Sequence, residues 1–390
     1  NAYERLWDRS VISNVMYDRD FGDRWRIHAD AGFSHSFNRH LDTDPAYSEP
    51  QDSRYSQSET ALAVRSMYMP DSSWKVVLAE DLYYNTLSSN IPECPFPLRM
   101  SSVSALSAQY EKASVRATAS LVATCMTESF LEGKTSTAAC RFRFSPAFGL
   151  SWNVSKGVYL RASYKDGFRM PTFNDLYYAR VGNRNLRPEI AHQTNVGLTF
   201  SRTYDWGCVD LTADGYYNFI KDKIVAVPTM FIWKMRNVGQ VAMYGVDVTA
   251  ALRWRLAKWM IFHLSGNYSL QYALDVTNPE SKSHMHQIPY TPRHCGVGDL
   301  TLEMPWVNLT YKMTAMGRRY VLNQNIPANE IPAYSDHALS LNRAFEFGRK
   351  HVYRVYVGLE ALNLSGINYE VIRYYPMPGR SFRLTLKFKY

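Results

Sequence analysis

Aromatic and cationic side chains in the long polar segments are the strongest candidates for chemistry in this sequence. Aromatic rings offer flat apolar contact, and a guanidinium group holds carboxylates or phosphates through paired hydrogen bonds. Such groups recognise a bulky ligand without covalent catalysis. Loop packing or interfacial anchoring explains each residue singly, so the prediction of a ligand vestibule concerns the whole set: Phe173, Tyr177, Tyr178, Arg180, Arg184, Trp233, Arg373, Tyr374 and Tyr375.

Patterns typical of enzymes are missing from the sequence. There is no Gly-x-Ser-x-Gly motif and no His-Glu-x-x-His motif. His192, Ser201 and Asp210 fall on neighbouring predicted strands, but such a triple arises easily by chance. We therefore expect no enzyme and no catalytic residues.

Two groups of residues could contact a metal ion. His284-Met-His286, near Glu280, carries imidazoles that suit zinc or copper. A second group supplies hard oxygen atoms that suit Ca²⁺, but without a glycine-marked loop: Asp42, Asp44, Glu49 and Asp52. Solvated loop side chains explain both groups better. We expect no metal site and no cofactor, with a calcium ion in the outer loops as the weaker alternative.

The five cysteines show neither a Cys-x-x-Cys motif nor a zinc-ligand spacing. Cys125 and Cys140 stand at the two ends of one long polar segment. In an oxidising compartment they could form a disulfide, and two unpaired thiols are an equally good interpretation. The disulfide predicts Cα atoms roughly 4.4–6.8 Å apart.

Strict alternation of apolar and polar residues marks the strands that would position these groups. In Val307–Arg318, the residues Val307, Leu309, Tyr311 and Met313 alternate with polar ones. The same period of two occurs in 209–219, 246–256 and 382–390. A period of two indicates a strand with one apolar face, and these runs reach the roughly 9–11 residues that cross a bilayer.

Turns between these strands alternate between short and long. The short turns are Asp20–Asp23, Pro70–Ser73, Glu111–Ala113, Asn153–Gly157, Thr203–Gly207, Ala257–Trp259, Glu303–Trp306 and Glu346–Lys350. The long segments are Phe37–Tyr55, Leu87–Arg99, Thr127–Arg141, Lys165–Glu189, Ile220–Tyr244, Leu274–Arg293, Gly317–Tyr334 and Asn363–Arg380. This polarity is typical of outer-membrane β-barrels, whose short turns face the periplasm.

Tryptophans support a barrel over the alternative of a soluble β-sandwich. Six of the nine lie in or beside short turns, where their rings would form one interfacial band: Trp25, Trp74, Trp152, Trp206, Trp259 and Trp306. The charge of +9 is spread over strands, turns and loops without a basic cluster, so we expect no nucleic-acid partner. No run of 18 apolar residues predicts a membrane-spanning helix.

Several ordered motifs follow one another from residue 165 onward: Lys165-Asp-Gly-Phe-Arg-Met-Pro-Thr-Phe-Asn-Asp-Leu-Tyr-Tyr178, Gly182-Asn-Arg-Asn-Leu-Arg-Pro-Glu189, Asn237-Val-Gly239, Tyr244-Gly-Val-Asp247 and Tyr375-Pro-Met-Pro-Gly-Arg380. These motifs resemble those of TonB-dependent outer-membrane receptors, most of all the Bacteroidetes receptors grouped with vitamin B12 transporters. The residues of this chain that match positions of the family motifs are Phe168, Arg169, Pro171, Asn183, Asn185, Pro188, Pro376, Gly379, Arg380 and Tyr390. We interpret them as structural: Asn183 and Asn185 tolerate left-handed turns, and Pro188 restarts an extended segment.

The resemblance implies an all-β fold, a transmembrane antiparallel up-and-down β-barrel of 22 strands with an N-terminal plug. About 17 strands are recognisable, so residues 1–390 read as the C-terminal part of that barrel, without plug or first strands. The first strand, near Val11–Tyr17, should then be unpaired on one side or make a strained closure. The implied location is the outer membrane of a Gram-negative cell.

The resemblance also implies the partners and the activity. These are the TonB–ExbB–ExbD complex acting through the plug, membrane lipid, a surface lipoprotein lid and a small-molecule ligand. Segment 172–184 lacks the histidine usual in haem receptors of the family. The expected ligand is therefore a corrinoid such as cobalamin, with a ferric siderophore as the close second. A passive porin or an adhesion barrel is the alternative function.

Overall fold

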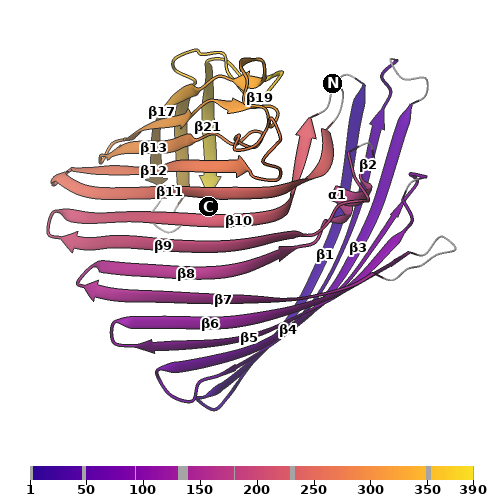
Figure 1. Ribbon diagram of the computed structural model, residues 1–390. Helices are drawn as coiled ribbons and strands as arrows, with labels where there is room; N and C mark the ends of the chain where they lie inside the picture. The colour runs from indigo at the N-terminus through magenta and orange to yellow at the C-terminus, as the bar shows by residue number, and fades with distance from the viewer. Residues whose placement is uncertain are drawn as a thin grey trace. The chain divides into compact units, whose positions relative to one another are not determined.

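The computed structural model describes residues 3–45, 50–92, 94–130, 139–179, 181–228, 233–347 and 353–389. Seventeen antiparallel strands form one sheet (Figure 1). They are β1 Glu4–Phe21, β2 Trp25–Asp42, β3 Gln51–Tyr68, β4 Trp74–Ser89, β5 Pro97–Lys112, β6 Val115–Phe130, β7 Ala139–Ser155, β8 Val158–Arg169, β9 Glu189–Tyr204, β10 Gly207–Pro228, β11 Trp233–Ala257, β12 Met260–Asp275, β13 His294–Glu303, β14 Asn308–Met316, β17 Tyr334–Phe347, β18 Tyr353–Leu362 and β21 Ser381–Lys389. The predicted fold class and strand number are confirmed. Among the described residues, no helix is long and apolar enough to cross a membrane.

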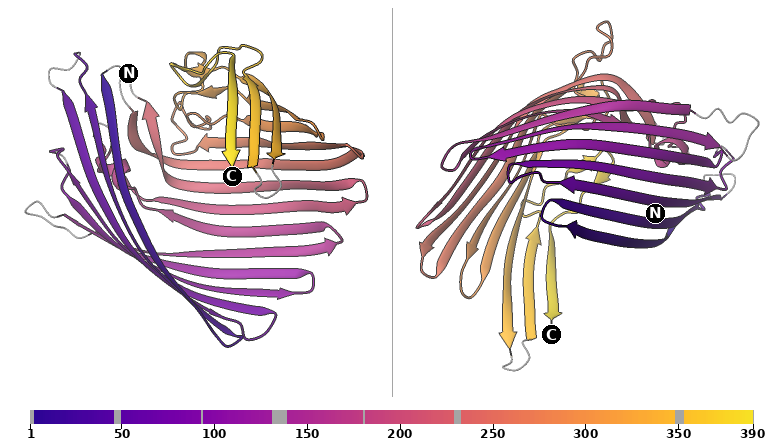
Figure 2. Two further views of the ribbon diagram at one scale, coloured as in Figure 1. Left: turned by 180° about the vertical axis from the view of Figure 1, so that it is seen from behind. Right: turned by 90° about the horizontal axis from the view of Figure 1, so that it is seen from below.

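Short elements lie in the long connections between these strands. They are the helix α1 Phe173–Tyr177, the 3₁₀ turn Pro327–Asn329, and two small hairpins formed by β15 Arg319–Tyr320 with β16 Glu330–Ile331 and by β19 Glu370–Ile372 with β20 Tyr375–Pro376. The main strands pair with their sequence neighbours, as β1 does with β2 along all 18 residues. Figure 2 shows the same meander as a gradual change of colour from strand to strand.

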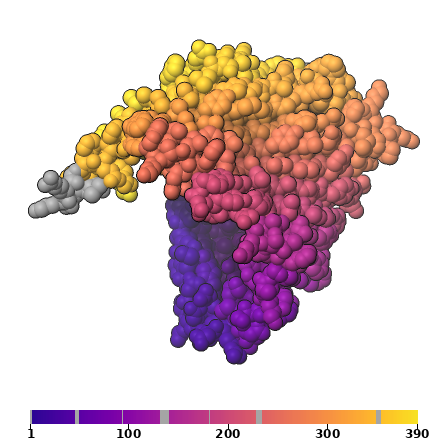
Figure 3. Space-filling model, turned by 90° about the vertical axis from the view of Figure 1, so that its left-hand side faces the viewer, coloured from indigo at the N-terminus to yellow at the C-terminus, as the bar shows by residue number. Residues whose placement is uncertain are grey.

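Contacts divide the chain into two compact units. Unit 1 comprises Asn1–Leu150, Ser163–His192 and Asp222–Asn237, and it contains β1–β6 and α1. Unit 2 comprises Ser151–Ala162, Gln193–Lys221 and Val238–Tyr390, and it contains β12–β21. Every residue of β1 is exposed, and Figure 3 shows the indigo N-terminal segment of unit 1 at the surface.

The predicted short turns are the short turns of the structure. Gly22–Arg24 separates β1 from β2, and Lys156 and Gly157 separate β7 from β8. The last predicted short turn, Glu346–Lys350, falls partly on 348–352, outside the described residues. All six interfacial tryptophans lie at or beside these turns, and their side chains are 41–60% exposed. This placement agrees with tryptophan rings that anchor the short-turn side of each unit at the periplasmic membrane interface.

The prediction of long loops was wrong in extent, because the ladders continue into several polar segments. β10 runs to Pro228 and β11 begins at Trp233, so most of the expected loop 220–244 is strand. β2 and β3 likewise use much of the expected loop 37–55. A strand that rises above the bilayer no longer needs an apolar face, so the alternating pattern disappears while backbone pairing persists.

One motif glycine shows why the Tyr244-Gly-Val-Asp247 pattern is structural. A Cβ atom on Gly245 would lie 2.1 Å from the backbone oxygen of Leu270 and 2.7 Å from the Tyr216 hydroxyl. A backbone atom of a paired strand cannot move away cheaply, so only glycine fits here. The motif therefore fixes the approach of β10 side chains to the β11–β12 ladder.

The two predicted disulfide partners are free cysteines whose thiols interact in the structure. Cys125 lies in β6, opposite Ser102 of β5, and Cys140 is the second residue of β7. The contact between the two thiols is compatible with oxidation to a disulfide. The disulfide stays a prediction.

Oxidation of the protein should join Cys125 to Cys140. Mass spectrometry of a non-reduced digest should find a cross-linked peptide pair containing both residues, absent after Cys140→Ser. Cys208, an unpartnered cysteine of unit 2, is the matched control and should stay alkylatable. Full alkylation of Cys125 and Cys140 in protein purified from oxidising conditions would contradict the prediction.

Candidate ligand-binding site

The connection from β8 to β9 in unit 1 carries the longest family motif and folds around α1. Thr172 caps this short helix: its hydroxyl accepts from the Asp175 amide at 3.1 Å, and the Asp175 carboxylate accepts from the Thr172 amide at 2.9 Å. This reciprocal cap satisfies two backbone donors that a helix start leaves open. Arg169 donates to the same carboxylate at 3.1 Å and lies 3.8 Å from Glu189, which joins the two ends of the connection.

Apolar residues of the connection pack into the main core cluster of unit 1. The cluster contains buried residues from α1 and its flank together with residues of the surrounding strand ends and loops: Phe173, Leu176, Tyr177, Leu186, Tyr55, Leu87, Cys94 and Ile224. Burial raises the pKa of the Cys94 thiol. The connection packs against apolar side chains from four other positions in the chain, so it is held in place. We call it the wall of the site.

Arg99 of β5 holds this wall to the sheet. Its guanidinium donates to Glu128 at 2.7 and 3.0 Å and to the Pro171 carbonyl at 2.8 Å, and it lies 4.8 Å from the centre of the Phe173 ring. The Tyr177 hydroxyl donates to the second oxygen of Glu128 at 3.0 Å. Burial and the Glu128 carboxylate raise the pKa of Tyr177 well above its ordinary value, so this phenol remains a donor.

Asparagines of the motifs act through their side chains. Neither Asn183 nor Asn185 has a positive φ, so the expected left-handed turns are not formed there. Asn183 instead donates to the Met235 carbonyl at 3.0 Å and accepts the Asn185 amide at 3.0 Å. Asn237 spans Arg187 and Asp222 in the same way, accepting from the Arg187 amide and donating to both carbonyls. An amide side chain offers a donor and an acceptor, which a turn conformation alone cannot replace.

A pocket of about 500 Å³ opens between this wall and the ends of β6 and β7. Its polar lining consists of Arg141, Arg184, Glu128 and Asn185, and its apolar lining consists of Met126, Phe130, Met170, Pro171, Leu176, Tyr177 and Leu186. Within the described part of the chain, neither Arg141 nor Arg184 forms an ion pair with a carboxylate, and both are exposed. Arg184 lies 6.0 Å from the Tyr177 ring centre. The pocket therefore combines apolar contact with two uncommitted positive charges.

The predicted vestibule residues do not all line the same site in the structure. Arg184 and Tyr177 line the pocket, whereas Phe173 is 4% exposed and supports it from within. Tyr178 stacks on Tyr55 at 5.3 Å, and the Tyr55 hydroxyl accepts from the Ala179 amide. Arg180 and the side chain of Trp233 lie outside the described residues. Sequence reasoning missed Arg141, Met126 and Glu128, because nothing local in β6 and β7 marks them as neighbours of the motif.

The other predicted vestibule residues belong to unit 2. Arg373 donates to the Ala328 carbonyl at 2.9 Å and lies 5.6 Å from the Tyr374 ring centre. Tyr374 has a φ of 68° and is 81% exposed, and Tyr375 is 66% exposed. These two rings project from the β19–β20 hairpin. They form a second aromatic surface within unit 2.

Arg319 anchors the loops that carry this surface. It is 1% exposed and donates to the carbonyls of Glu370, Val371 and Pro332, so it joins two long connections. Burial lowers the pKa of Arg319. Tyr369 stacks on Tyr334 with ring centres 4.1 Å apart, and burial and the hydrogen bond to Asp336 raise the pKa of Tyr369 to about 12.

Most of the other family-motif residues lie within the described part of the chain. Pro171 is fully buried, Phe168 lies 5.9 Å below the Arg143 guanidinium, and Pro188 precedes β9 as expected. Pro376 ends β20, Gly379 has open space around it, and Arg380 lies beside Gly366. Tyr390 falls outside the described residues.

The groups weighed for catalysis or metal binding have other partners. His192 contacts Tyr164 at 3.1 Å and Asp166 at 3.2 Å, while Ser201 donates to Asp210 at 2.5 Å. His192 and Ser201 lie nine residues apart on β9, which places their side chains on opposite faces of the strand. His286 accepts the Asn325 amide at 3.2 Å.

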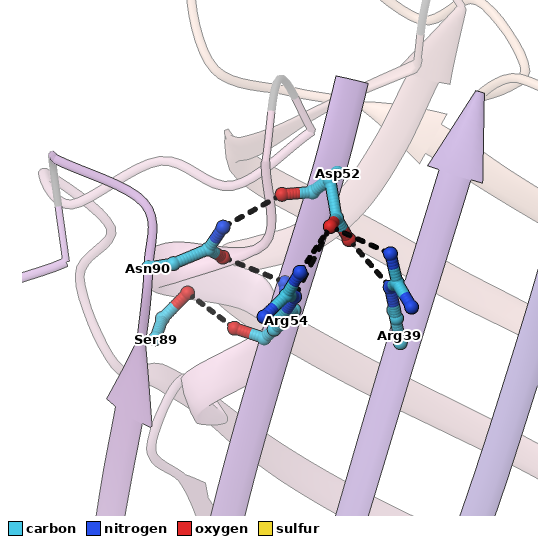
Figure 4. A network of polar contacts seen from close by, with 5 residues as sticks. All are labelled: Arg39, Asp52, Arg54, Ser89 and Asn90. Atoms are coloured by element: carbon cyan, nitrogen blue, oxygen red, sulfur yellow. Dashed lines mark hydrogen bonds and ion pairs between the residues drawn. The ribbon is translucent and has the colours of Figure 1, made fainter. Parts of the chain in front are cut away.

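The acidic group also has partners within the protein. Asp52 is bound by two arginines (Figure 4), Asp42 accepts the Asp44 amide, and Glu49 lies outside the described residues. Among the described residues, no group of three or more potential metal ligands gathers at one point.

Comparisons with known proteins agree with this architecture. The family described as "TonB dependent receptor-like, beta-barrel" matches residues 3–364. Two proteins named vitamin B12 transporter BtuB, from Vibrio vulnificus and Photobacterium profundum, are 34% and 30% identical over 126 and 118 residues. These segments are 30% and 29% of this chain but only 20% and 18% of those relatives, so the match spans about a fifth of their length.

Solved structures show the same fold at low sequence identity. The copper transporter OprC superposes with a TM-score of 0.78 at 12% identity, over 98% of this chain and 65% of that one. The siderophore receptor PiuA from Acinetobacter baumannii gives 0.74 at 14% identity, over 100% and 66%. The ferric citrate transporter FecA gives 0.76 at 12% identity, over 99% and 62%. The chain belongs to the TonB-dependent receptor family, and its strands are those of the β-barrel with which these proteins span the outer membrane of Gram-negative bacteria.

Proposed function

We propose that this barrel is part of an uptake receptor that binds a scarce nutrient at its outer mouth and imports it with energy from TonB. The proposal includes contact with the TonB–ExbB–ExbD complex through a plug domain, and a surface lipoprotein as a lid. The ligand is a corrinoid such as cobalamin, with a ferric siderophore as the alternative. The observation that carries the proposal is the pocket beside α1 with its two uncommitted arginines.

The pocket has the size and lining of a binding site for part of a bulky ligand. Its volume of about 500 Å³ lies within the range of small-molecule sites, and a mostly apolar lining with a few fixed polar groups is their usual composition. The apolar wall is held rigidly by Arg99 and by the α1 cap, so little conformational entropy is lost on binding. Arg141 and Arg184 would hold a carboxylate or phosphate group of the ligand.

Ligand choice rests on the relatives and on charge. The matched segments of the two B12 transporters favour a corrinoid, whose single phosphodiester would bind between the arginines. A ferric catecholate would place more negative charge against the same groups, and solved relatives include siderophore and ferric citrate receptors. The choice between the two ligands therefore depends on which of them the full-length receptor binds more tightly.

Calorimetry of the full-length receptor with cyanocobalamin, beside a ferric catecholate, tests the proposal. We expect tight, saturable binding of cobalamin. Binding of the ferric complex alone would replace the corrinoid with the siderophore. Passage of both solutes through receptor-containing vesicles without saturable binding would favour the porin alternative.

Replacing Arg141 and Arg184 together with glutamine should weaken ligand binding about 150-fold or more, since each of the two charged hydrogen bonds contributes roughly 1.5–3 kcal/mol. The effect should be in the dissociation constant, because both side chains are exposed and contribute little to folding. The control is Arg116→Gln at a short turn, where Arg116 pairs with Glu111 at 2.7 Å. Unchanged affinity in the double variant would move the site away from this pocket.

A further inference from the structure

One carboxylate lies on the apolar face of the sheet in unit 1. Glu80 of β4 is opposite Val64 of β3 and Ser104 of β5, and residues directly opposite each other in a ladder share a face. The same face carries the exposed leucines of four strands: Leu62, Leu78, Leu82, Leu106 and Leu121. β4 pairs with β3 and β5, and β5 pairs with β4 and β6, so this face lies inside the sheet and not at an edge.

The opposite face of the same strands holds the wall of the site. Arg99, which donates to the Pro171 carbonyl beside α1, is opposite Asn85 of β4. Asn85 follows Glu80 by five residues, and an odd separation along a strand places two side chains on opposite faces. Glu80 therefore points away from the pocket and towards the lipid that surrounds the barrel.

The depth of Glu80 corresponds to the middle of the bilayer. Glu80 follows Trp74, one of the tryptophans at the short turns, by six residues along β4. With a rise of about 3.3 Å per residue and a strand tilt of about 40°, Glu80 lies roughly 15 Å above Trp74. The apolar band of such barrels is about 25 Å tall, so acyl chains and not headgroups or water surround this position.

Two hydroxyl groups hold the Glu80 side chain in one orientation. Ser102 donates to one carboxylate oxygen at 2.6 Å, and Ser104 donates to the other. None of the ion pairs among the described residues includes Glu80. Each oxygen can accept more than one hydrogen bond, so acceptor positions remain unused. Acyl chains cannot fill them, and an ionisable side chain that faces lipid is costly unless another polar group meets it.

The surface is small at its centre and bulky around it. Ala123 of β6 is opposite Ser104, so Glu80 has Ser102, Ser104 and Ala123 beside it on this face. The five leucines named above surround this centre and are 44–59% exposed. We call these four central residues and the five leucines the Glu80 patch. Small residues let a second protein surface approach closely, and a polar group among them strengthens association within a membrane.

We propose that the Glu80 patch is the contact surface between two copies of this receptor in the membrane. A two-fold axis perpendicular to the membrane keeps both copies in the same orientation, so their Glu80 side chains meet at the same depth. A carboxyl group that carries a proton is both a donor and an acceptor, so two Glu80 groups across the axis complement each other. The surrounding leucines of the two copies exclude lipid from this polar centre. The contact is separate from the pocket and does not require the nutrient.

Energy transfer between full-length receptors that carry donor or acceptor dyes tests the proposal in liposomes of increasing protein-to-lipid ratio. Wild-type receptor should associate saturably, with the dependence on acceptor fraction that a dimer gives. Glu80→Leu should weaken association about tenfold, as expected when a hydrogen-bonded pair in lipid is lost. Glu80→Gln should retain most of the association, because an amide is also both a donor and an acceptor. Asp81→Leu is the matched control, because the adjacent side chain lies on the opposite face of β4.

Wild-type receptor that stays monomeric at every ratio would leave the Glu80 patch to lipid and overturn the proposal. Equal association of Glu80→Leu and wild type would also overturn it, and a lower free energy of unfolding of that variant in detergent micelles would then show that Glu80 only ties β4 to β5. Energy transfer that fits a larger assembly would overturn the two-fold arrangement. If Glu80→Leu does not fold, Ser104→Trp gives the answer: it keeps Glu80 but fills the small centre, and it should prevent association.

Discussion

Replacing Arg99 with leucine should lower the apparent free energy of unfolding of the full-length receptor by about 3–5 kcal/mol, as expected when one partner of a buried ion pair is removed. Arg99 is 8% exposed, and its loss leaves the Pro171 carbonyl without the Arg99 donor and the Glu128 carboxylate without its counter-charge, although the Tyr177 hydroxyl still donates to Glu128. It also removes the cation from the Phe173 ring. Denaturant unfolding in detergent micelles measures the change.

Hydrogen exchange locates the effect of this substitution. Segment 172–187 should exchange much faster in the leucine variant, because Arg99 connects it to β5, while the β1–β2 ladder should be unchanged. Arg116→Leu is the control, since its ion pair with Glu111 is about half exposed and should contribute little to stability. Equal losses in the two variants would show that Arg99 is not a special anchor.

Replacing Asp166 with alanine should destabilise unit 1 by a similar amount, about 3–5 kcal/mol. The side chain of Asp166 is 5% exposed and accepts from Arg143 at 2.7 Å and from Ser145 at 3.0 Å, with His192 at 3.2 Å. The substitution leaves Arg143 without a counter-charge and several donors unsatisfied. The same unfolding measurement tests it.

Asp210→Ala is the control for Asp166. Asp210 is exposed and pairs with the Ser201 hydroxyl, so its loss should cost well under about 1 kcal/mol. Asp166→Asn keeps the shape and part of the hydrogen bonding, and it should recover part of the loss. A stability of Asp166→Ala within error of wild type would show that Arg143 finds another partner.

The vestibule residues show where sequence reasoning succeeded and where it could not. Arg184 and Tyr177 were found because they belong to a motif, and they do line the pocket. Arg141 and Glu128 lie in other strands, and only the register of the ladders brings them to the motif. Register depends on pairing between distant segments, which local alternation does not encode.

Arginines that meet across the ladders of β1, β2 and β3 show the same limit. By sequence the basic residues look dispersed, because Arg9, Arg39 and Arg54 are far apart along the chain. The antiparallel ladders place Arg39 opposite Arg54, and strand parity puts both on the face of Trp7. A cluster formed across strands has no linear signature.

The sequence by itself determined the strands, the polarity of short and long turns and the tryptophan anchors, because each depends on residues within one hairpin. It also determined the family, through ordered motifs such as 165–178. Tertiary structure alone decided that ladders continue through polar segments, that Phe173 is buried under the pocket while Tyr374 is exposed, and which charges are paired. These outcomes depend on burial and register between segments far apart in the chain, and those are set only when the whole sheet assembles.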